Sequence, residues 1–570
     1  MRVAANGRSS PGRVAVCAVA VFSFVTCLRT IADLDYWTHL ALGRTFVTAR
    51  TIFVAEPFLG SPSPRPPAPR GLEALLTAMT LSSEWPFQVF LFGFREAAGD
   101  VGVSVLIAVL AAAAGALLST ALLSEARPAR AALGAAFVAG AMSVARFRFS
   151  PRPEAACAVL LAVVLLLASR WARRPRWTLL VAIVAVLLAW RPVHPTWTLG
   201  ATFAALGMAS RGAVDFVRRQ PLVLRIGLLG VAFLALRGAA SFAWFVAREI
   251  RDGGLLAQVT EMRSTWEFPS VLWPFASVAA AGAVLAWGAP AGRWRRVGVW
   301  AAALVTGLVV VRNVAFAALA MVPGALEGLS SFPPRSARAR LLAPAGPVVL
   351  AVLLVLALRD RDPPWGAGVD WRGLPRQSAE FVKTSGVPFP VFNTWDQGGY
   401  LDWAWNGEPR TFADGRLHDA AALADHDSVM SGSPGAVLER RGFRTVLLQP
   451  LFRNSARIAP AVFWFTSNPG WRLVHASDAL VFTVAPLPPG VSELPRREAW
   501  RVVSRYADLL AEQNEWPPHV EFTRAIALLE LGDARAALAA YERGVRAAPV
   551  VARQYAPLRH VLETRARSGP

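Results

Sequence analysis

The chain has 570 residues, of which 54% are hydrophobic and only 17% charged. This composition excludes a string of soluble domains, whose surfaces carry more charge. The formal net charge is +21, and residues 1–360 carry most of it, with 35 arginines against 16 acidic residues, whereas residues 361–570 hold 24 basic and 22 acidic residues. Arginines that flank membrane spans explain this distribution better than a nucleic-acid surface does. We therefore predict a membrane protein that does not bind nucleic acid.

Apolar segments of roughly spanning length recur through the first 360 residues and predict about eleven membrane helices. The first one follows a basic amino terminus and lacks a clear cleavage site, so we interpret it as a retained span. The predicted spans cover residues 14–32, 101–124, 131–145, 154–169, 177–190, 196–210, 222–247, 270–289, 297–311, 313–326 and 341–358.

Arginine clusters fall on alternate loops between these spans, which is the pattern of the positive-inside rule. The alternation places the 33–100 loop, the 248–269 loop and everything after residue 359 outside the cytoplasm. The weak step is 297–326, where two short spans could be one long span. A single span there would reverse the orientation of the carboxyl-terminal half.

The 33–100 loop is too long for a simple hairpin and ends in a mixed apolar run. For this run we expect helices that lie on or partly in the membrane surface. After Pro363 and Pro364 the composition becomes soluble. The segments 445–452 and 479–485 read as short strands of a compact α/β domain over residues 376–486.

Residues 496–568 predict a helical tail after a proline-rich linker. Ala525, Leu528, Gly532, Ala537, Tyr541 and Pro549 sit close to the spacing of one tetratricopeptide (TPR) unit. One unit is a weak signal, and an ordinary helical hairpin is an equal alternative. In either case the tail is a packing or docking element, to which a protein partner could bind.

Two carboxylates, Asp33 and Asp35, follow the first predicted span, where an acid must be solvated, paired or used. Such a pair can share a divalent cation, or split into one charged and one proton-accepting group. Trp37 would mark the membrane interface, and His39 could reach a phosphate or a neighbouring acid. The alternative is a solvated helix cap beside an ordinary interface aromatic.

The soluble part holds two further polar motifs. Gly398 and Gly399 predict a tight turn, and Asp414 and Arg416 can stand at a loop tip around Gly415. No nucleophile elbow, P-loop or HExxH motif occurs in the sequence. This region is interpreted either as an external domain that helps to bind an acceptor or as a structural turn.

Several short motifs, taken together, resemble a family of bacterial multi-span proteins that is similar to the GT-C superfamily of membrane glycosyltransferases. Three positions depart from the family pattern, because Thr38 replaces a tryptophan, Glu56 an aspartate and Pro192 an asparagine. The motifs are DLDYWTHLALGR (33–44), AEPF (55–58), SEWPFQVFLFGF (83–94), RFSPRPE (148–154), WRPVHPTWTLG (190–200), RN (312–313), FNTWDQGGYLDW (392–403) and ADGR (413–416).

This resemblance implies a GT-C-like membrane domain over 1–360 in a bacterial inner membrane. With the soluble α/β domain and the TPR-like tail predicted above, the loop charges then place the carboxyl-terminal domain in the periplasm. The resemblance also implies transfer of sugar from a polyprenyl-phosphate donor to a lipid, glycan or protein acceptor. Asp33 and Asp35 would then be catalytic, with or without a divalent metal. The residues implied to bind substrate are His39, Glu84, Arg148, Arg152, His194, Arg312, Asp414 and Arg416.

Each of these side chains has an ordinary alternative. Arginines at span ends usually reach lipid headgroups, and a lone histidine near a membrane helix is often only hydrogen-bonded. The rival function is a non-enzymatic membrane-anchored scaffold, which acts through its periplasmic domain and its TPR-like tail.

Overall fold

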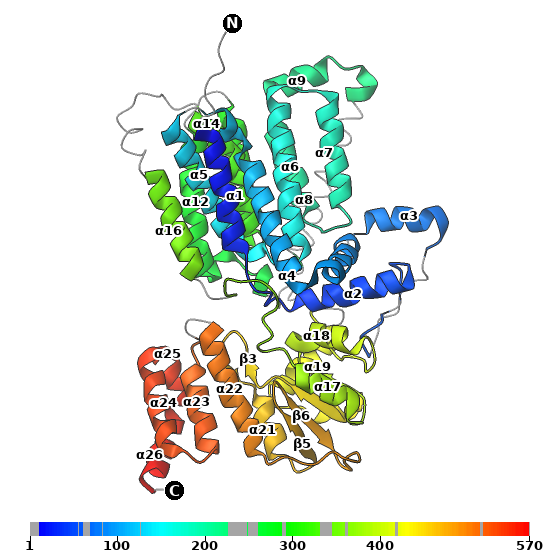
Figure 1. The fold of residues 1–570 in the computed structure, drawn as a ribbon, viewed down its shortest axis with the longest axis vertical. Coiled ribbons are helices and arrows are strands. Elements are labelled where there is room, and N and C mark those ends of the chain that lie inside the picture. Colours follow the sequence, from blue (N-terminus) through cyan, green and yellow to red (C-terminus); the bar gives the residue numbers. More distant parts are fainter. Residues whose placement is uncertain are drawn as a thin grey trace. The chain divides into compact units, whose positions relative to one another are not determined.

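The computed structural model forms two compact units (Figure 1), which are Met1–Ile31, Pro69–Asp360 and Trp365–Val369 in the first, and Ala32–Ala68, Arg361–Pro364 and Asp370–Pro570 in the second. The loop expected over 33–100 is therefore divided between the two units, and most of the predicted span at 222–247 falls outside the described residues. The residues that the structure describes are 11–54, 56–60, 69–81, 84–125, 127–225, 248, 260–287, 292–330, 345–359, 363–416, 420–513 and 517–568.

The first unit is helical, and its apolar helices make the chain a membrane protein. Among the described residues, five helices are long and apolar enough to cross a membrane, namely Trp85–Ser124, Pro128–Arg148, Pro153–Arg173, Pro269–Trp287 and Val311–Ser330. They contain α4 (Trp85–Leu118), α5 (Pro128–Ala145), α6 (Pro153–Arg173), α12 (Pro269–Trp287) and α14 (Val314–Ser330). Shorter apolar helices among the described residues are α1 (Pro11–Cys27), α7 (Trp177–Trp190), α8 (Trp197–Met208) and α16 (Ala345–Arg359). Helix α13 (Arg293–Val309) begins with three arginines in its first four residues and continues as an apolar segment. The expected count of about eleven spans stays a prediction.

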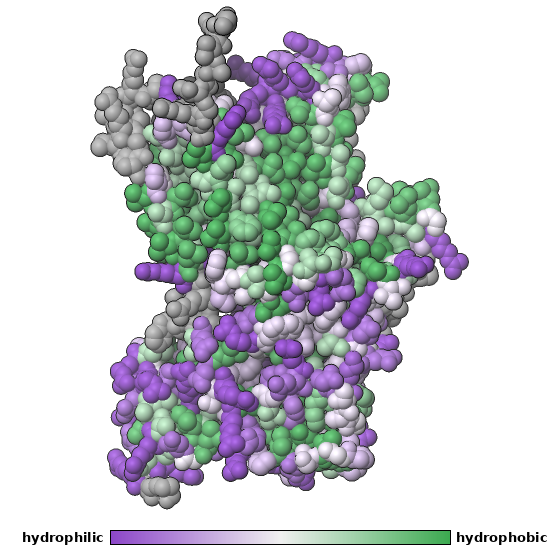
Figure 2. Space-filling model, in the orientation of Figure 1, coloured by the Kyte–Doolittle hydropathy of each residue, from purple (hydrophilic) through white to green (hydrophobic). Residues whose placement is uncertain are grey.

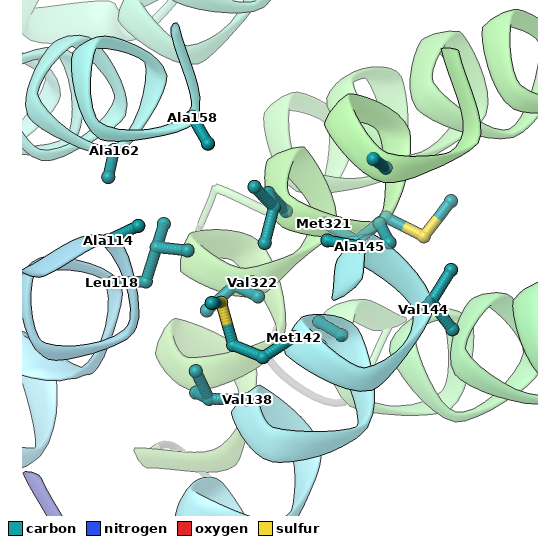
Figure 3. Packing of buried hydrophobic residues seen from close by; sticks show 14 of the residues in the cluster. Ala114, Leu118, Val138, Met142, Val144, Ala145, Ala158, Ala162, Met321 and Val322 are labelled. Atoms are coloured by element: carbon teal, nitrogen blue, oxygen red, sulfur yellow. The ribbon is translucent and has the colours of Figure 1, made fainter. Parts of the chain in front are cut away.

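Helix α14 lies at the centre of the first unit, where it packs against α5, α6, α12 and α13. Figure 3 shows side chains of α4, α5, α6 and α14 meeting in this core, among them Leu118, Met142, Ala162 and Val322. Small residues allow the close approach of backbones that membrane helices use. At Gly328, for example, an added Cβ would come within 1.8 Å of a carbonyl oxygen of α12.

The ambiguous segment 297–326 forms two helices rather than one. Helix α13 ends at Val309, and a 3-10 turn, η5 (Val311–Asn313), leads into α14. The pair is antiparallel, because Gly307 faces Ala317 while Arg296, near the other end of α13, faces Gly324. The chain therefore reverses direction at this point, as the two-span reading requires.

Two short helices of the first unit lie outside its bundle, α3 (Gly71–Thr80) and α9 (Arg211–Arg218). Helix α3 buries none of its residues, and its exposed leucines and methionine recur at positions 72, 75, 76 and 79. Figure 2 shows hydrophobic surface over α3 and over the long helices, and hydrophilic surface over α9. An exposed apolar stripe of this spacing is typical of a helix that lies in the membrane surface.

The second unit contains a four-stranded sheet in the order β1-β2-β6-β5, in which β1 is parallel to β2 and the other pairs are antiparallel. The segments expected as strands at 445–452 and 479–485 contribute β2 and β6. The strands are β1 (Val391–Asn393), β2 (Thr445–Leu448), β5 (Trp471–Ala476) and β6 (Leu480–Val484), with a separate pair β3 (Leu451–Phe452) and β4 (Arg457–Ile458).

Both faces of this sheet are buried, because neighbouring residues of each strand point to opposite sides. Leu447 and Val481 pack in one hydrophobic cluster with α17 (Arg376–Thr384) and α18 (Trp395–Trp405). Val446 and Phe482 pack in another cluster with residues of the remaining helices. These are α19 (Ala420–Met430), α20 (Gly435–Arg441), α21 (Pro460–Ser467) and α22 (Arg497–Gln513).

The carboxyl-terminal helices pack onto this domain. Helix α22 places Trp500, Val503 and Tyr506 in the sheet core, so the domain core extends beyond residue 486. Helices α23 (Val520–Glu530) and α24 (Ala534–Ala547) form an antiparallel hairpin that turns at Gly532 and is joined by a Glu521–Arg543 ion pair. The short helix α25 (Pro549–Ala552), the turn η6 (Arg553–Tyr555) and α26 (Ala556–Ser568) complete the chain.

Candidate functional site

The first unit gathers seven ionisable side chains at helix ends, here called the arginine–glutamate cluster. Five of its members were predicted from the sequence, and the structure adds Glu154 and Glu261. The residues come from different turns: Arg148 ends the short turn η2 (Arg146–Arg148) after α5, Arg152 and Glu154 begin α6, and Arg312 lies in η5. The cluster consists of Glu84, Arg148, Arg152, Glu154, His194, Glu261 and Arg312.

Glu154 is the buried centre of the cluster, with a side chain that is 1% exposed. Its Oε1 lies 2.6 Å from Nη2 of Arg312, 3.7 Å from Nε2 of His194 and 3.9 Å from Nη1 of Arg148. A buried carboxylate is stable only with such partners, and its place in the first turn of α6 adds the favourable end of the helix dipole. Pro153 favours the start of the helix at this point.

His194 connects Glu154 to a second acid. Its Nδ1 accepts the backbone N–H of Thr196 at 3.2 Å and lies 3.0 Å from the hydroxyl of the same residue, and its Nε2 lies 3.3 Å from Nη2 of Arg312. Nε2 lies 3.5 Å from Oε1 of Glu84. Glu84 adopts a left-handed backbone conformation (φ 64°) immediately before α4, which few residues with side chains accept. This conformation is typical of functional positions, where backbone strain is tolerated.

Glu261, in the 3-10 turn η3 (Thr260–Met262), is the more exposed acid of the cluster and faces all three arginines. Its oxygens lie 3.1 Å from Nη1 of Arg148, 3.5 Å from Nη1 of Arg152 and 4.0 Å from Nε of Arg312. Within the described part of the chain, Nε of Arg148 donates to no acceptor, although the side chain is only 7% exposed. Arg148 thus retains hydrogen-bonding capacity.

The second unit contains a separate charged group around Arg416, here called the Arg416 cluster, with Glu56, Asp402 and Asp414. The guanidinium donates to both oxygens of Glu56 at 2.9 and 3.1 Å and, through Nε, to Oδ2 of Asp414 at 2.8 Å. The backbone amide of Arg416 adds a bond to Oδ1 of Asp414 at 2.8 Å. Asp414 and Arg416, predicted as substrate-binding residues, are thus engaged with each other inside this unit.

The two aspartates of the Arg416 cluster have opposite pKa shifts. Burial, reinforced by the negative charge of Asp414, raises the pKa of Asp402 well above its ordinary value. Burial also favours a higher pKa for Asp414, but Arg416 outweighs it and holds that pKa below the usual range. Oδ1 of Asp402 accepts the hydroxyl of Thr411 at 2.7 Å, and a protonated Asp402 can donate to Asp414. One proton between two acids lets both be buried beside one arginine.

Asp33 and Asp35 also belong to the second unit, at the start of helix α2 (Asp35–Ala49). Both are partly buried, and Oδ1 of Asp33 accepts the backbone N–H of Asp35 at 3.0 Å. Oδ1 of Asp35 lies against Gly415, where a Cβ would come within 2.8 Å. His39 is buried further along α2, with 7% of its surface exposed. The structure thus brings Asp35 to the Asp-Gly-Arg loop.

Two sequence predictions about local structure are wrong. Gly398 and Gly399 do not form a turn but lie inside α18, where Gly399 allows contact with Thr38 of α2 and Gly398 with the 413–414 backbone. Trp37 does not mark a membrane interface, because it is 2% exposed and packs against Tyr36, Trp371, Tyr400 and Trp403. The glycine Gly399 and the tryptophan Trp37 both allow α2 and α18 to pack closely.

Sequence reasoning missed four acids of these clusters as site residues. Glu154 had a usable signal, because an acid that begins an apolar span needs a partner. Glu56 and Asp402 stood within recognised motifs, and only their distance from Arg416 in space gives them a role. Glu261 had no local signal. Among the described residues, no three histidine, cysteine or acidic side chains gather as metal ligands, and a divalent ion at Asp33 and Asp35 stays a prediction.

No family model matches the chain, and no curated protein sequence does. Among solved structures, the chain is similar to the oligosaccharyltransferase AglB from Archaeoglobus fulgidus in complex with an inhibitory peptide and a dolichol-phosphate, with 12% identity, 86% of this chain and 76% of that chain covered, and a TM-score of 0.38. It is also similar to the apo form of an oligosaccharyltransferase from the same organism, with 12% identity, 86% and 77% covered, and a TM-score of 0.35. Both scores are too low to establish a shared fold.

Proposed function

We propose that this protein is an integral-membrane glycosyltransferase that moves a sugar from a polyprenyl-phosphate donor to a lipid, glycan or protein acceptor on the periplasmic face of a bacterial inner membrane. The arginine–glutamate cluster holds the phosphate of the donor. In the reaction, the bond between the glycosyl carbon and the phosphate oxygen breaks. The carbon bonds to the acceptor oxygen, and the acceptor proton passes to a protein base.

The observation that carries this proposal is the position of the three arginines. Arg148 ends one membrane-length helix, Arg152 immediately precedes the next, and Arg312 lies in the first turn of a third. Helix ends lie at the depth of lipid headgroups, which is where the phosphate of a lipid-linked sugar is found. Guanidinium groups bind phosphate oxygens bidentately, and the buried Nε of Arg148 has no acceptor among the described residues.

The acceptor base is assigned to Asp35, with Asp33 orienting it through the bond to its backbone amide. A carboxylate at a helix start can accept a proton from an acceptor hydroxyl. Glu84 is the competing candidate, because it is 25% exposed and lies beside His194. The two candidates separate in a transfer assay that compares Asp35→Asn with Glu84→Gln.

The test of the proposal is transfer by the purified protein in detergent with polyprenyl-phosphate sugars from a membrane lipid extract. The expected result is loss of the donor and appearance of a glycosylated acceptor, with a raised donor KM in Arg152→Gln. If a folded preparation transfers no sugar from any lipid fraction, the enzymatic proposal fails. The scaffold function, with a protein partner on the carboxyl-terminal tail, then becomes the better explanation.

The periplasmic orientation has its own test. The antiparallel α13–α14 pair supports two crossings between residues 293 and 330, which would leave the second unit on the side opposite the arginine-rich loops. A reporter that is active only in the periplasm, fused after residue 364, should therefore be active. Activity of a cytoplasm-specific reporter at the same position would overturn this orientation.

A further inference from the structure

We infer that Glu261 is an internal stand-in for the phosphate of the donor, which a phosphodiester displaces from Arg148, Arg152 and Arg312 when it binds. This inference rests on the proposed function, because it names how the phosphate enters the same cluster. It assigns to Glu261 a role different from that of Glu154, although both are glutamates that face the same arginines.

The two glutamates differ in burial and in the way they are held. The Glu154 side chain is 1% exposed and begins α6, so its charge is fixed inside the unit. The Glu261 side chain is 35% exposed and belongs to a three-residue turn. An exposed carboxylate returns to water at little cost, whereas an uncompensated buried one is strongly destabilising. Glu261 is therefore the acid that a ligand can replace.

The contacts of Glu261 have the pattern of a bound phosphate. Its two oxygens are divided among three guanidinium groups, with Oε2 facing Arg148 and Arg312, and Oε1 facing Arg152. Arg148 and Arg152 come from the connection between α5 and α6, and Arg312 comes from the connection between α13 and α14. A phosphate group offers oxygens in the same region and can also reach the buried Nε of Arg148, which has no acceptor among the described residues. The ligand thus gains a hydrogen bond that the carboxylate does not make.

The charges also match. The described cluster holds three arginines and three glutamates beside His194. A glycosyl phosphodiester carries one negative charge, as a glutamate carboxylate does, so the exchange leaves the local charge unchanged. A phosphomonoester, which is the product left on the lipid after transfer, carries more negative charge. Glu261 then competes with the product as well and favours its release by repulsion.

The experiment measures binding of a short-chain dialkyl phosphate to the full-length protein in detergent, by calorimetry and by the shift of the thermal unfolding midpoint. Glu261→Gln removes the competing charge and should lower the Kd by up to about fivefold, the range expected for loss of a partly exposed ion pair. Glu261→Asp keeps the charge on a shorter side chain and should fall between Glu261→Gln and the wild type.

The matched control is Glu267→Gln, which removes the same charge a few residues away. Glu267 pairs with Arg263 at 3.6 Å, and both side chains are more than half exposed. Its Kd should equal that of the wild type. If Glu267→Gln tightens binding as much as Glu261→Gln, the effect is general electrostatics and the inference is wrong. The inference is also wrong if Glu261→Gln binds the phosphodiester no more tightly than the wild type, or if neither protein binds it.

A parallel transfer assay separates this inference from the proposed function. Tighter phosphodiester binding by Glu261→Gln, with no sugar transfer by any variant, would support the exchange of Glu261 for phosphate and contradict the glycosyltransferase function. Sugar transfer by the wild type, without tighter phosphodiester binding by Glu261→Gln, would support the glycosyltransferase function and contradict the exchange of Glu261 for phosphate.

Discussion

The arginine–glutamate cluster and the Arg416 cluster both combine arginines with acidic side chains, but they differ in how many hydrogen bonds the arginines make. In the second unit, the backbone amide and the guanidinium of Arg416 make five hydrogen bonds to two acids, Glu56 and Asp414, and both acids are buried. In the first unit, three arginines share the partly exposed Glu261, and Nε of Arg148 stays without an acceptor among the described residues. A satisfied cluster stabilises a fold, whereas an incompletely satisfied one can bind a ligand.

The largest expected effect concerns Asp35, which lies beside the Arg416 cluster and which we propose as the base. Asp35→Asn keeps the shape and the first turn of α2 and removes the proton acceptor. General-base catalysis is typically worth about 10²- to 10⁴-fold in rate, so transfer should fall by this factor. The thermal unfolding midpoint should stay near that of the wild type. Full activity of both Asp35→Asn and Asp33→Asn in cells would exclude a catalytic role for this helix start.

A second substitution breaks the Arg416 cluster. Asp414→Asn removes the main counter-charge of a guanidinium that is only 14% exposed. Loss of one partner of a buried pair costs about 3–5 kcal/mol, and the free energy of unfolding should fall by this amount. Chemical denaturation followed by the fluorescence of the second unit's tryptophans measures the loss. A loss below about 1 kcal/mol, the range of surface pairs, would show that the cluster is not structural.

A smaller and pH-dependent effect is expected at Asp402. Because its folded-state pKa is raised, the unfolded chain ionises first as pH rises, and the native state loses stability above about pH 4. Asp402→Asn cannot ionise, and its amide can replace the proton donated to Asp414. The stability of Asp402→Asn relative to the wild type should therefore rise between about pH 4 and pH 7, by at most about 1.4 kcal/mol per pH unit.

Asp414 changes stability in the opposite direction. Its lowered pKa stabilises the folded state above about pH 4, and this contribution is lost as pH falls through the folded-state value. Denaturation curves of Asp402→Asn, Asp414→Asn and the wild type at several pH values separate the two carboxyls. A relative stability of Asp402→Asn that stays constant with pH would mean that Asp402 is ionised in the folded protein.

The smallest change in the free energy of unfolding is expected for an exposed ion pair. It gives the reference value against which the buried pairs are compared. Arg472 and Glu493 lie 3.1 Å apart in the second unit, and both side chains are more than one-third exposed. Glu493→Gln should change the free energy of unfolding by less than about 1 kcal/mol. A change as large as that of Asp414→Asn would show that burial does not govern the strength of ion pairs in this unit.

The sequence predicted a membrane protein with apolar helices and the strands β2 and β6, because their hydropathy patterns are local. The strand β5 was not predicted. The sequence also predicted the individual arginines at span ends, since charge beside an apolar run is visible in a single segment. Contacts between distant segments were not predictable. Arg416 and Glu56 are 360 positions apart, and Glu261 meets Arg148 across 113 positions. The helical glycines of α18 were misread because Gly-Gly favours a turn locally, while packing against α2 favours a helix.

The account's central claim is that the arginines of the first unit bind a ligand while Arg416 of the second unit holds a fold. One measurement compares Arg152→Gln and Arg416→Gln for donor KM and for thermal unfolding in the same detergent. We expect Arg152→Gln to raise the KM for the polyprenyl-phosphate donor about tenfold, the effect of losing one charge-assisted hydrogen bond, with an unchanged unfolding midpoint. We expect Arg416→Gln to lower the midpoint. An Arg152→Gln protein that unfolds early with an unchanged KM, or an Arg416→Gln protein that keeps its midpoint but loses donor affinity, would contradict the claim.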